Sequence, residues 1–259
     1  TNAAQALSAV VKTGTPFQRV VANVLRRYTV GIRVVVLQEG QDVPDELKTG
    51  TNAENWKEAR ALYVPSADGK GTVYLRGSSF GKDQGVNNPT MLHELWHAAA
   101  NGKLVLGIHE LVKFGEIKSQ AARFAYDIQL IAAQAKEAYK ILDVRGLIPA
   151  DLQNLVFNTL RMEDDGTMSL AIFDDAREFL AYGMSDDVFE DFLNSIPGDK
   201  VDTPMPTRKS LFTRFFQAMR DVLNMKQALG IAPESESALA GLITASNHLI
   251  ASSKTRWMR

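Results

Sequence analysis

The sequence predicts an α+β fold that is mostly helical, with a small sheet on one side of a helical body. Short β-branched and apolar runs are confined to the first third of the chain, whereas almost every later segment repeats apolar residues at helical spacing. Strands and helices that are segregated along the chain are typical of α+β proteins, because an alternating α/β chain would interleave them.

The composition allows a sizeable core and narrows the possible chemistry. Of the 259 residues, 45% are hydrophobic and 23% are charged, which are ordinary values for a globular domain. The formal net charge is -1, so we expect no nucleic-acid partner. The chain has no cysteine, which excludes disulfide bonds and thiolate nucleophiles and leaves histidine, aspartate and glutamate as metal ligands.

The sequence contains no recognisable targeting or membrane segment. No apolar run approaches the roughly 20 residues that cross a bilayer, and the first residues lack the basic start and apolar core of a signal peptide. We therefore expect no transmembrane segment and no signal peptide, which favours a cytoplasmic location. Because the chain begins with threonine rather than methionine, we also expect that it could belong to a larger polypeptide.

The predicted strands lie in the first third of the chain. A helix is expected to begin at a Thr15 cap, because residues 17–25 carry an apolar stripe at helical spacing. The β-branched run 32–37 predicts a strand that is buried on both faces. The segments that follow are expected to be a polar loop over 38–56, a hairpin of strands 61–64 and 72–76 around a Gly-rich turn, and a second loop over 77–88.

Nearly all of the chain after Pro89 predicts helix. Proline and glycine residues near 200 interrupt this pattern, so we divide the chain into a domain over 1–200 and a helical extension over 201–259, expected to pack on the same body. The apolar stripe within 211–223 has basic neighbours, so it either faces the core or binds a membrane surface or a partner. Helices are expected over residues 91–100, 114–142 (one long helix, or two separated by a kink), 151–162, 175–182, 188–193, 210–225 and 237–251.

The most informative segment is His93-Glu94-Leu95-Trp96-His97, an HExxH motif. Two histidines four residues apart lie on one face of a helix, about one turn from each other, so both imidazoles can reach one zinc ion. Glu94 lies beside them and can approach a water molecule on the same metal, where it would act as the general base. Asn88 as N-cap, followed by Pro89, and a stop at 101–102 predict the bounds of this helix.

A catalytic zinc ion usually has three protein ligands and a water molecule, so the two histidines need a partner. Ala100 and Lys103 exclude the extended HExxHxxGxxH motif. Glu178 is the best candidate, because it lies in a largely apolar segment where a carboxylate requires a partner such as a metal. The alternatives that the sequence leaves open are Asp174, Asp175 and His109.

Other residues are candidates for supporting roles around the metal. Tyr182 lies one turn after Glu178 and Asp174 about one turn before it, so either could orient a ligand from outside the coordination shell. The reaction also needs a donor that stabilises the oxyanion, and the candidates are Tyr182, His109 and Arg177. The strand 72–76 could bind an extended substrate if it lies at the edge of the sheet, or it could be an ordinary hairpin strand.

With these residues in view, the chain resembles the HExxH zinc metallopeptidase domains, gluzincin-like in type, that occur in large polyvalent proteins of phages and mobile elements. The resemblance implies a zincin-like fold, with the sheet packed beside the HExxH helix, and a zinc ion held by His93, His97 and Glu178. It also implies that Glu94 is the base in the hydrolysis of a protein or peptide, in a cytoplasmic or virion-associated protein. It rests on the segments 14–19, 32–37, 89–98, 177–182 and 212–229.

Two other functions fit the same residues. One is a catalytically inactive, metal-stabilised structural module of a larger phage or mobile-element protein, in which protein ligands would fill every coordination position. The other is a toxin or effector protease that acts on a host protein. The second would use the same site as a processing protease, so the sequence does not separate those two.

Overall fold

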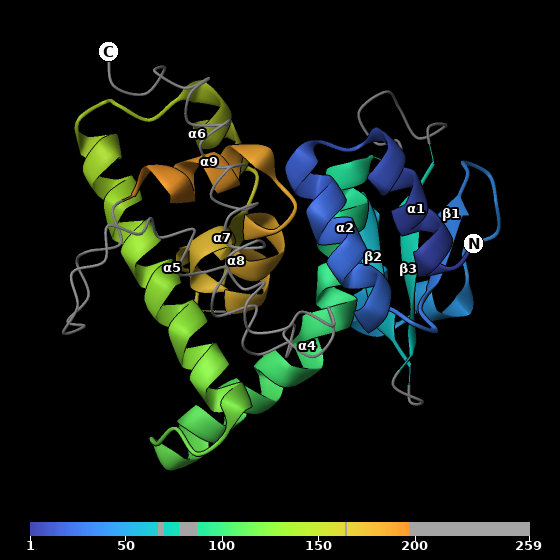
Figure 1. The fold of residues 1–259 in the computed structure, drawn as a ribbon, viewed down its shortest axis with the longest axis horizontal. Coiled ribbons are helices and arrows are strands. Elements are labelled where there is room, and N and C mark those ends of the chain that lie inside the picture. Colours follow the sequence, from blue (N-terminus) through green and yellow to red (C-terminus); the bar gives the residue numbers. More distant parts are fainter. Residues whose placement is uncertain (67–69, 78–86, 164, 197–259) are drawn as a thin grey trace, which may run out of the picture.

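The computed structural model describes residues 1–66, 70–77, 87–163 and 165–196 (Figure 1). Figure 1 shows a lobe of strands and helices on one side, a group of helices on the other, and the long helix α4 (Asn88–Phe114) between them. Several expectations lie outside the described residues: the helices 210–225 and 237–251, the boundary near 200, the extension 201–259 with its apolar stripe, most of the loop 77–88 and the middle of the hairpin turn.

Two helices, α1 (Ala3–Thr13) and α2 (Pro16–Tyr28), belong to the lobe that contains the strands, which we call the sheet lobe. The side chain of Thr15 accepts a hydrogen bond from the N–H of Gln18, whose side chain reaches back to the N–H of Thr15. This capping box satisfies two donors at the start of α2, where the helix would otherwise leave them without partners. The predicted helix start at Thr15 is confirmed, whereas α1 was not predicted.

The main sheet has the strand order β1-β3-β2. β1 (Arg33–Leu37) is parallel to β3 (Gly71–Arg76), and β2 (Ala61–Pro65) is antiparallel to it, which confirms the predicted hairpin. Because β3 is the central strand, the expectation that residues 72–76 could offer a free edge is wrong, and β2 has that position instead. The expectation that β1 is buried on both faces is also wrong, because β1 is the opposite edge strand and Val36 is 40% exposed.

The segment between β1 and β2 is not the loop that its polar composition predicted. It contains a short 3-10 helix at Asp45–Leu47 and the helix α3 (Gly50–Glu58). Leu47 and Trp56 are buried and pack with Tyr74 in a second, smaller core. Successive side chains of a strand point to opposite faces, so Tyr74 faces this small core while its neighbours on β3 face the main one. A few apolar side chains therefore suffice to hold an otherwise polar segment in place.

The helix α4 is much longer than the sequence predicted. Its N-cap is Asn87 rather than Asn88, and the side chain of Asn87 accepts a hydrogen bond from the N–H of Thr90 at 2.8 Å. The expected stop at 101–102 is wrong, because the helix continues to Gly115, whose φ of 65° is the left-handed conformation that glycine favours. The later turns bury further apolar residues, so tertiary packing outweighs the weak helix propensity of asparagine and glycine.

The helix α5 (Gln120–Val144) turns back after the end of α4 and packs against its later turns, and in Figure 1 the two helices then diverge. The range 114–142, predicted as one long helix or as two separated by a kink, corresponds to α5, which begins at Gln120, and only Phe114 of that range belongs to α4. The two backbones approach closely at Gly107, where a Cβ atom would lie 2.9 Å from the Cβ of Ala125 and closer still to the carbonyl of Ala121. Only glycine fits this crossing without a shift of one helix.

A group of short elements follows beside α4 and α5. The expected helix over 151–162 is wrong in its second half, where two short strands form an antiparallel hairpin. The rings of Tyr139, Phe173, Phe189 and Phe179 form a chain of contacts with centroids 5.4 to 5.7 Å apart, which links the three segments that carry these phenylalanines to α5. The elements are α6 (Ala150–Phe157), β4 (Leu160–Met162), β5 (Met168–Leu170), α7 (Ala171–Asp174), α8 (Ala176–Gly183) and α9 (Asp187–Ser195).

Taken over the described residues, the structure is mostly helical with a small sheet, which confirms the predicted α+β class. Within that part of the chain, no helix combines the length and the apolar character that crossing a membrane requires.

The crossing of α4 and α5 is testable by substitution. We expect Gly107→Ala to lower the free energy of unfolding by about 1–3 kcal/mol, because the new methyl group would overlap the backbone of α5. The matched control is Gly102→Ala in the same helix, where no atom lies within 4 Å of the new Cβ and the change should stabilise by up to about 1 kcal/mol. Chemical denaturation followed by circular dichroism measures both, and equal effects would contradict the close crossing.

Candidate metal centre

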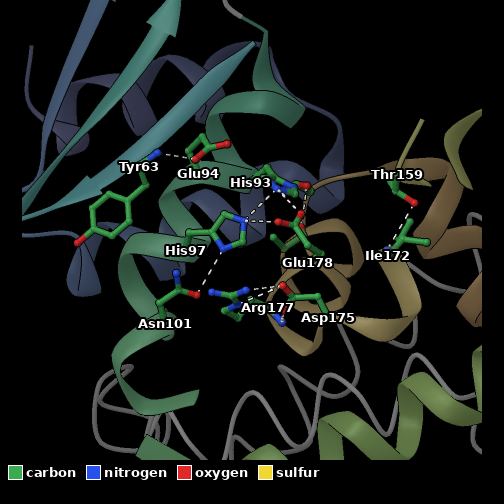
Figure 2. Close-up of polar contacts among 12 residues, drawn as sticks. Tyr63, His93, Glu94, His97, Asn101, Thr159, Ile172, Asp175, Arg177 and Glu178 are labelled. Atoms are coloured by element: carbon green, nitrogen blue, oxygen red, sulfur yellow. Dashed lines mark hydrogen bonds and ion pairs between the residues drawn. The ribbon is translucent and has the colours of Figure 1, made fainter. Parts of the chain in front are cut away.

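Three side chains that the sequence singled out converge at one point between α4 and α8. The Nε2 atoms of His93 and His97 lie 3.1 Å apart. The Oε2 atom of Glu178 lies 3.3 Å from Nε2 of His93, and its Oε1 atom lies 3.8 Å from Nε2 of His97. One ligand atom from each residue falls within 4.8 Å of the others, and Figure 2 shows all three side chains pointing inward.

These distances fit a metal ion. A tetrahedral ion bound at about 2.0–2.1 Å keeps its ligand atoms roughly 3.3–3.4 Å apart. The separations of 3.1 and 3.3 Å lie close to this value, and the third, 3.8 Å, is to the other oxygen of Glu178, so an ion could be bound after a small adjustment of the carboxylate. Two imidazoles and a carboxylate are also a donor set suited to a divalent transition metal. The residues present therefore fit a metal site in both geometry and chemistry.

Two helices position these side chains. His93 and His97 lie one turn apart on the first half of α4, on the side that faces α8 (Figure 2). Glu178 lies in the first turn of α8, where the Asp175 side chain caps the helix by accepting a hydrogen bond from the N–H of Arg177 at 2.8 Å. Most of the other residues of α8 are buried, so the helix is pressed against its neighbours and Glu178 is held at α4.

Burial and neighbouring charges shift the pKa values of the three residues in different directions. Burial lowers the pKa of His93, but the hydrogen bond to Glu178 and the negative charges nearby outweigh it, so this pKa lies above its ordinary value. Burial and the charge of His93 lower the pKa of His97 to about 4. Burial raises the pKa of Glu178, but His93, His97 and Arg161 hold it well below its usual range. The two shifts favour a protonated His93 beside an ionised Glu178, and a bound cation would compete with that proton.

Glu94 lies beside the ligands but is not one of them. It is 9% exposed, and burial raises the pKa of its carboxyl group. Its Oε2 atom accepts a hydrogen bond from the main-chain N–H of Tyr63 on β2 at 2.8 Å (Figure 2). The charges of His93 and Glu178 both act on the pKa of Glu94, so the carboxyl group lies within electrostatic reach of the candidate ligands.

Two further residues contact the ligands from outside. The Nδ1 atom of His97 lies 3.4 Å from the Oδ1 atom of Asn101, one turn further along α4. This contact favours the tautomer with a proton on Nδ1, which leaves Nε2 to bind the ion. On the other side, the guanidinium of Arg161 on β4 donates a hydrogen bond to Oε1 of Glu178 at 3.1 Å.

The residues predicted to support the site have different positions. Tyr182 lies at the site, with its ring centroid 4.6 Å from that of His93, and burial raises the pKa of its hydroxyl, which stays a donor. The role proposed for Asp174 is wrong, because its carboxylate contacts Lys136 and accepts a hydrogen bond from the N–H of Leu170.

The role proposed for His109 is also wrong. His109 is exposed on α4, twelve residues after His97, which is about 18 Å along the helix axis. Arg177 lies next to the site, but Asp175 holds its guanidinium through hydrogen bonds of 3.0 and 2.6 Å.

Three contacts at the site were not predicted, and they differ in whether the sequence held a signal. Asn101 follows His97 by four residues, so the helical spacing that identified the two histidines could also have identified it. Tyr63 and Arg161 come from strands of two different sheets, and no periodicity links either one to the motif. Their roles depend on the packing of the folded chain alone.

The proton on His93 makes metal affinity depend on pH, because binding must displace it. At pH values below the raised pKa of His93, we expect the dissociation constant of a divalent metal to fall about tenfold for each unit by which the pH rises, with release of about one proton per ion. Isothermal titration with Zn²⁺ or Co²⁺ in buffers of different ionisation enthalpy measures both. Glu178→Gln removes both the anionic partner of His93 and one of the three proposed ligands, so it should weaken binding and also reduce the protons released per ion bound. An affinity independent of pH would contradict a protonated His93.

The contact between Asn101 and His97 gives a second prediction. Asn101→Ala should weaken metal binding about tenfold, because His97 loses the group that orients its ring. Asn101→Asp keeps an acceptor at the same place and should retain the affinity. Competition with a chromogenic chelator compares the two variants, and equal losses would show that the amide oxygen does not orient the imidazole.

Comparisons with protein-family models, with curated proteins and with solved structures find no match to this chain. The function must therefore be argued from the residues of the site themselves.

Proposed function

We propose that this chain is a zinc-dependent peptidase in which Glu94 is the general base. The observation that carries the proposal is the arrangement around α4: His93, His97 and Glu178 converge on one point, and a buried carboxylate that is not part of that set lies beside them. Two imidazoles and one glutamate are a ligand set used by catalytic zinc sites of peptidases, which keep a position for water.

The composition of the ligand set supports zinc over other ions. Calcium and magnesium prefer oxygen ligands, whereas imidazole nitrogen suits zinc, and the chain has no cysteine to form a thiolate site. Among the described residues the group holds three ligand residues, which fits a catalytic site better than the alternative of a structural module with four.

The residues of the chain have separate roles in the proposed reaction. A bound zinc ion supplies a Lewis acid that acidifies water and polarises the scissile carbonyl. Glu94 takes the proton of the attacking water and delivers it to the leaving amine. Tyr182, whose ring packs against that of His93, is the best placed of the predicted donors to the oxyanion.

The sheet supports a peptide as the substrate. β2 is an edge strand that packs beside α4, so an extended peptide bound along it through its outward carbonyl groups would lie next to the metal and the base, while the outward N–H of Tyr63 is taken by Glu94. An edge strand beside an HExxH helix also favours a zincin-like fold. We further propose that the domain belongs to the group found in polyvalent proteins of phages and mobile elements, where it would be part of a larger polypeptide.

The separation of ligands from base gives a direct test. Glu94→Gln should keep about one zinc ion per chain and lose at least about 100-fold in hydrolysis, because the amide cannot accept the proton. His97→Ala should lose the metal and the activity together. Metal analysis and mass spectrometry of a digested peptide library measure both effects. A Glu94→Gln variant that cleaves as fast as the wild type, or a wild type that binds no zinc, would overturn the proposal.

A further inference from the structure

We propose that the main-chain N–H of Tyr63 is a positioning group for Glu94, so that the edge strand β2 holds the base of the reaction. The inference rests on the proposed function, because it assigns how the base of that site is held. Its physical basis is the 2.8 Å hydrogen bond from this N–H to Oε2 of Glu94.

The register of the hairpin explains why this N–H reaches Glu94. The N–H of Arg76 donates to the carbonyl of Arg60, and the N–H of Ser66 donates to the carbonyl of Lys70, so the even-numbered positions of β2 are bonded to β3. In an antiparallel pair, bonded and non-bonded positions alternate, so residues 61, 63 and 65 direct their main-chain groups away from β3.

The residues at these outward positions differ as donors. Residue 65 is a proline, which has no N–H, and its outward position leaves the pairing with β3 intact. The next outward position after Tyr63 has no N–H, because it is the proline. The outward N–H of Tyr63 donates its hydrogen bond to Glu94. The donor is directed at α4 by strand register and does not depend on a side-chain rotamer.

Burial makes this contact significant for both partners. Glu94 is 9% exposed, so its carboxylate has lost most of its contact with water and requires a donor within the protein. A hydrogen bond to a charged group is stronger than one between neutral groups, and it restricts the carboxylate to one orientation. Without it, the side chain would be free to change rotamer and turn away from the metal.

The strand itself is held firmly. The ring of Tyr63 covers Gly71 on the neighbouring strand, where an added Cβ atom would lie 2.8 Å from Cζ of the ring. The pairing with β3 fixes the other side of β2. The N–H is thus part of a preorganised backbone, the kind of donor that costs no rearrangement during a reaction. If a peptide substrate lies along β2, the same strand sets the position of both the substrate and the base.

The kinetic test compares two substitutions at one position. Tyr63→Ala removes the ring and keeps the N–H, whereas Tyr63→Pro removes both. We expect kcat of Tyr63→Pro to be about tenfold below that of Tyr63→Ala, with the same KM and the same zinc content. If the N–H binds the substrate instead, KM rises and kcat does not fall, which would overturn the proposal, as would identical kinetics of the two variants.

A second variant covers the case in which Tyr63→Pro does not fold. Replacing the amide at position 63 by an ester, through incorporation of the α-hydroxy analogue of tyrosine, removes only the N–H and keeps the ring. The same loss in kcat is expected relative to the wild type, and an ester variant with wild-type kcat and KM would overturn the proposal.

Amide hydrogen exchange tests the contact independently of catalysis. In metal-free protein, Glu94→Ala should make the Tyr63 amide exchange at least about tenfold faster, because its acceptor is gone. The amides of Leu62 and Val64, which face β3, should keep their rates and serve as internal controls. Unchanged exchange at Tyr63 would overturn the positioning role even if zinc-dependent hydrolysis is observed. A chain that shows the exchange effect but no hydrolysis would instead overturn the proposed peptidase function.

Discussion

The burial of the Glu178 carboxylate between two imidazoles is the constraint on which the rest of the structure depends. A carboxylate removed from water is costly unless positive charge lies beside it. His93, whose pKa is raised, meets this need at 3.3 Å together with Arg161 at 3.1 Å, while His97 lies 3.8 Å away, and one turn of α4 fixes the separation of the two imidazoles. α8 must therefore pack against α4 at the turn that carries the two histidines. The same geometry serves the protein with a proton on His93 and with a cation in its place.

This requirement explains the shape of the helical body. Glu178 follows His97 by a long stretch of chain, which must leave α4 and return to it. The extension of α4 far beyond the motif, and the turn back into α5, which packs against α4 at Gly107, provide that path. The aromatic contacts that end at Phe179 then fix α8 in place. The packing of α4, α5 and α8 thus holds the Glu178 carboxylate in position. The same part of the fold brings the guanidinium of Arg161 to that carboxylate.

The sheet lobe holds the other carboxylate. Glu94 projects from the same helix as the two histidines, but its partner is the N–H of Tyr63 on β2 and not a residue of the helical body. The candidate ligands and the candidate base are therefore positioned by different layers, with α4 shared between them (Figures 1 and 2). In the proposed peptidase, this arrangement lets the metal affinity and the placement of the base vary separately, because each depends on its own packing contacts.

The sequence by itself determined the features that arise within one element. The spacing of His93 and His97 places both imidazoles on one helix face, and the cap at Thr15 and the hairpin of β2 and β3 follow from local chemistry in the same way. Only the tertiary structure decided which distant groups meet them. Packing brings Glu178 to the histidines, gives Asp174 a different partner, extends α4 through 101–102 and makes β2 rather than β3 the edge strand. The physical reason is range: helix and strand periodicity act over a few residues, whereas contacts between elements depend on how the whole chain buries its apolar surface.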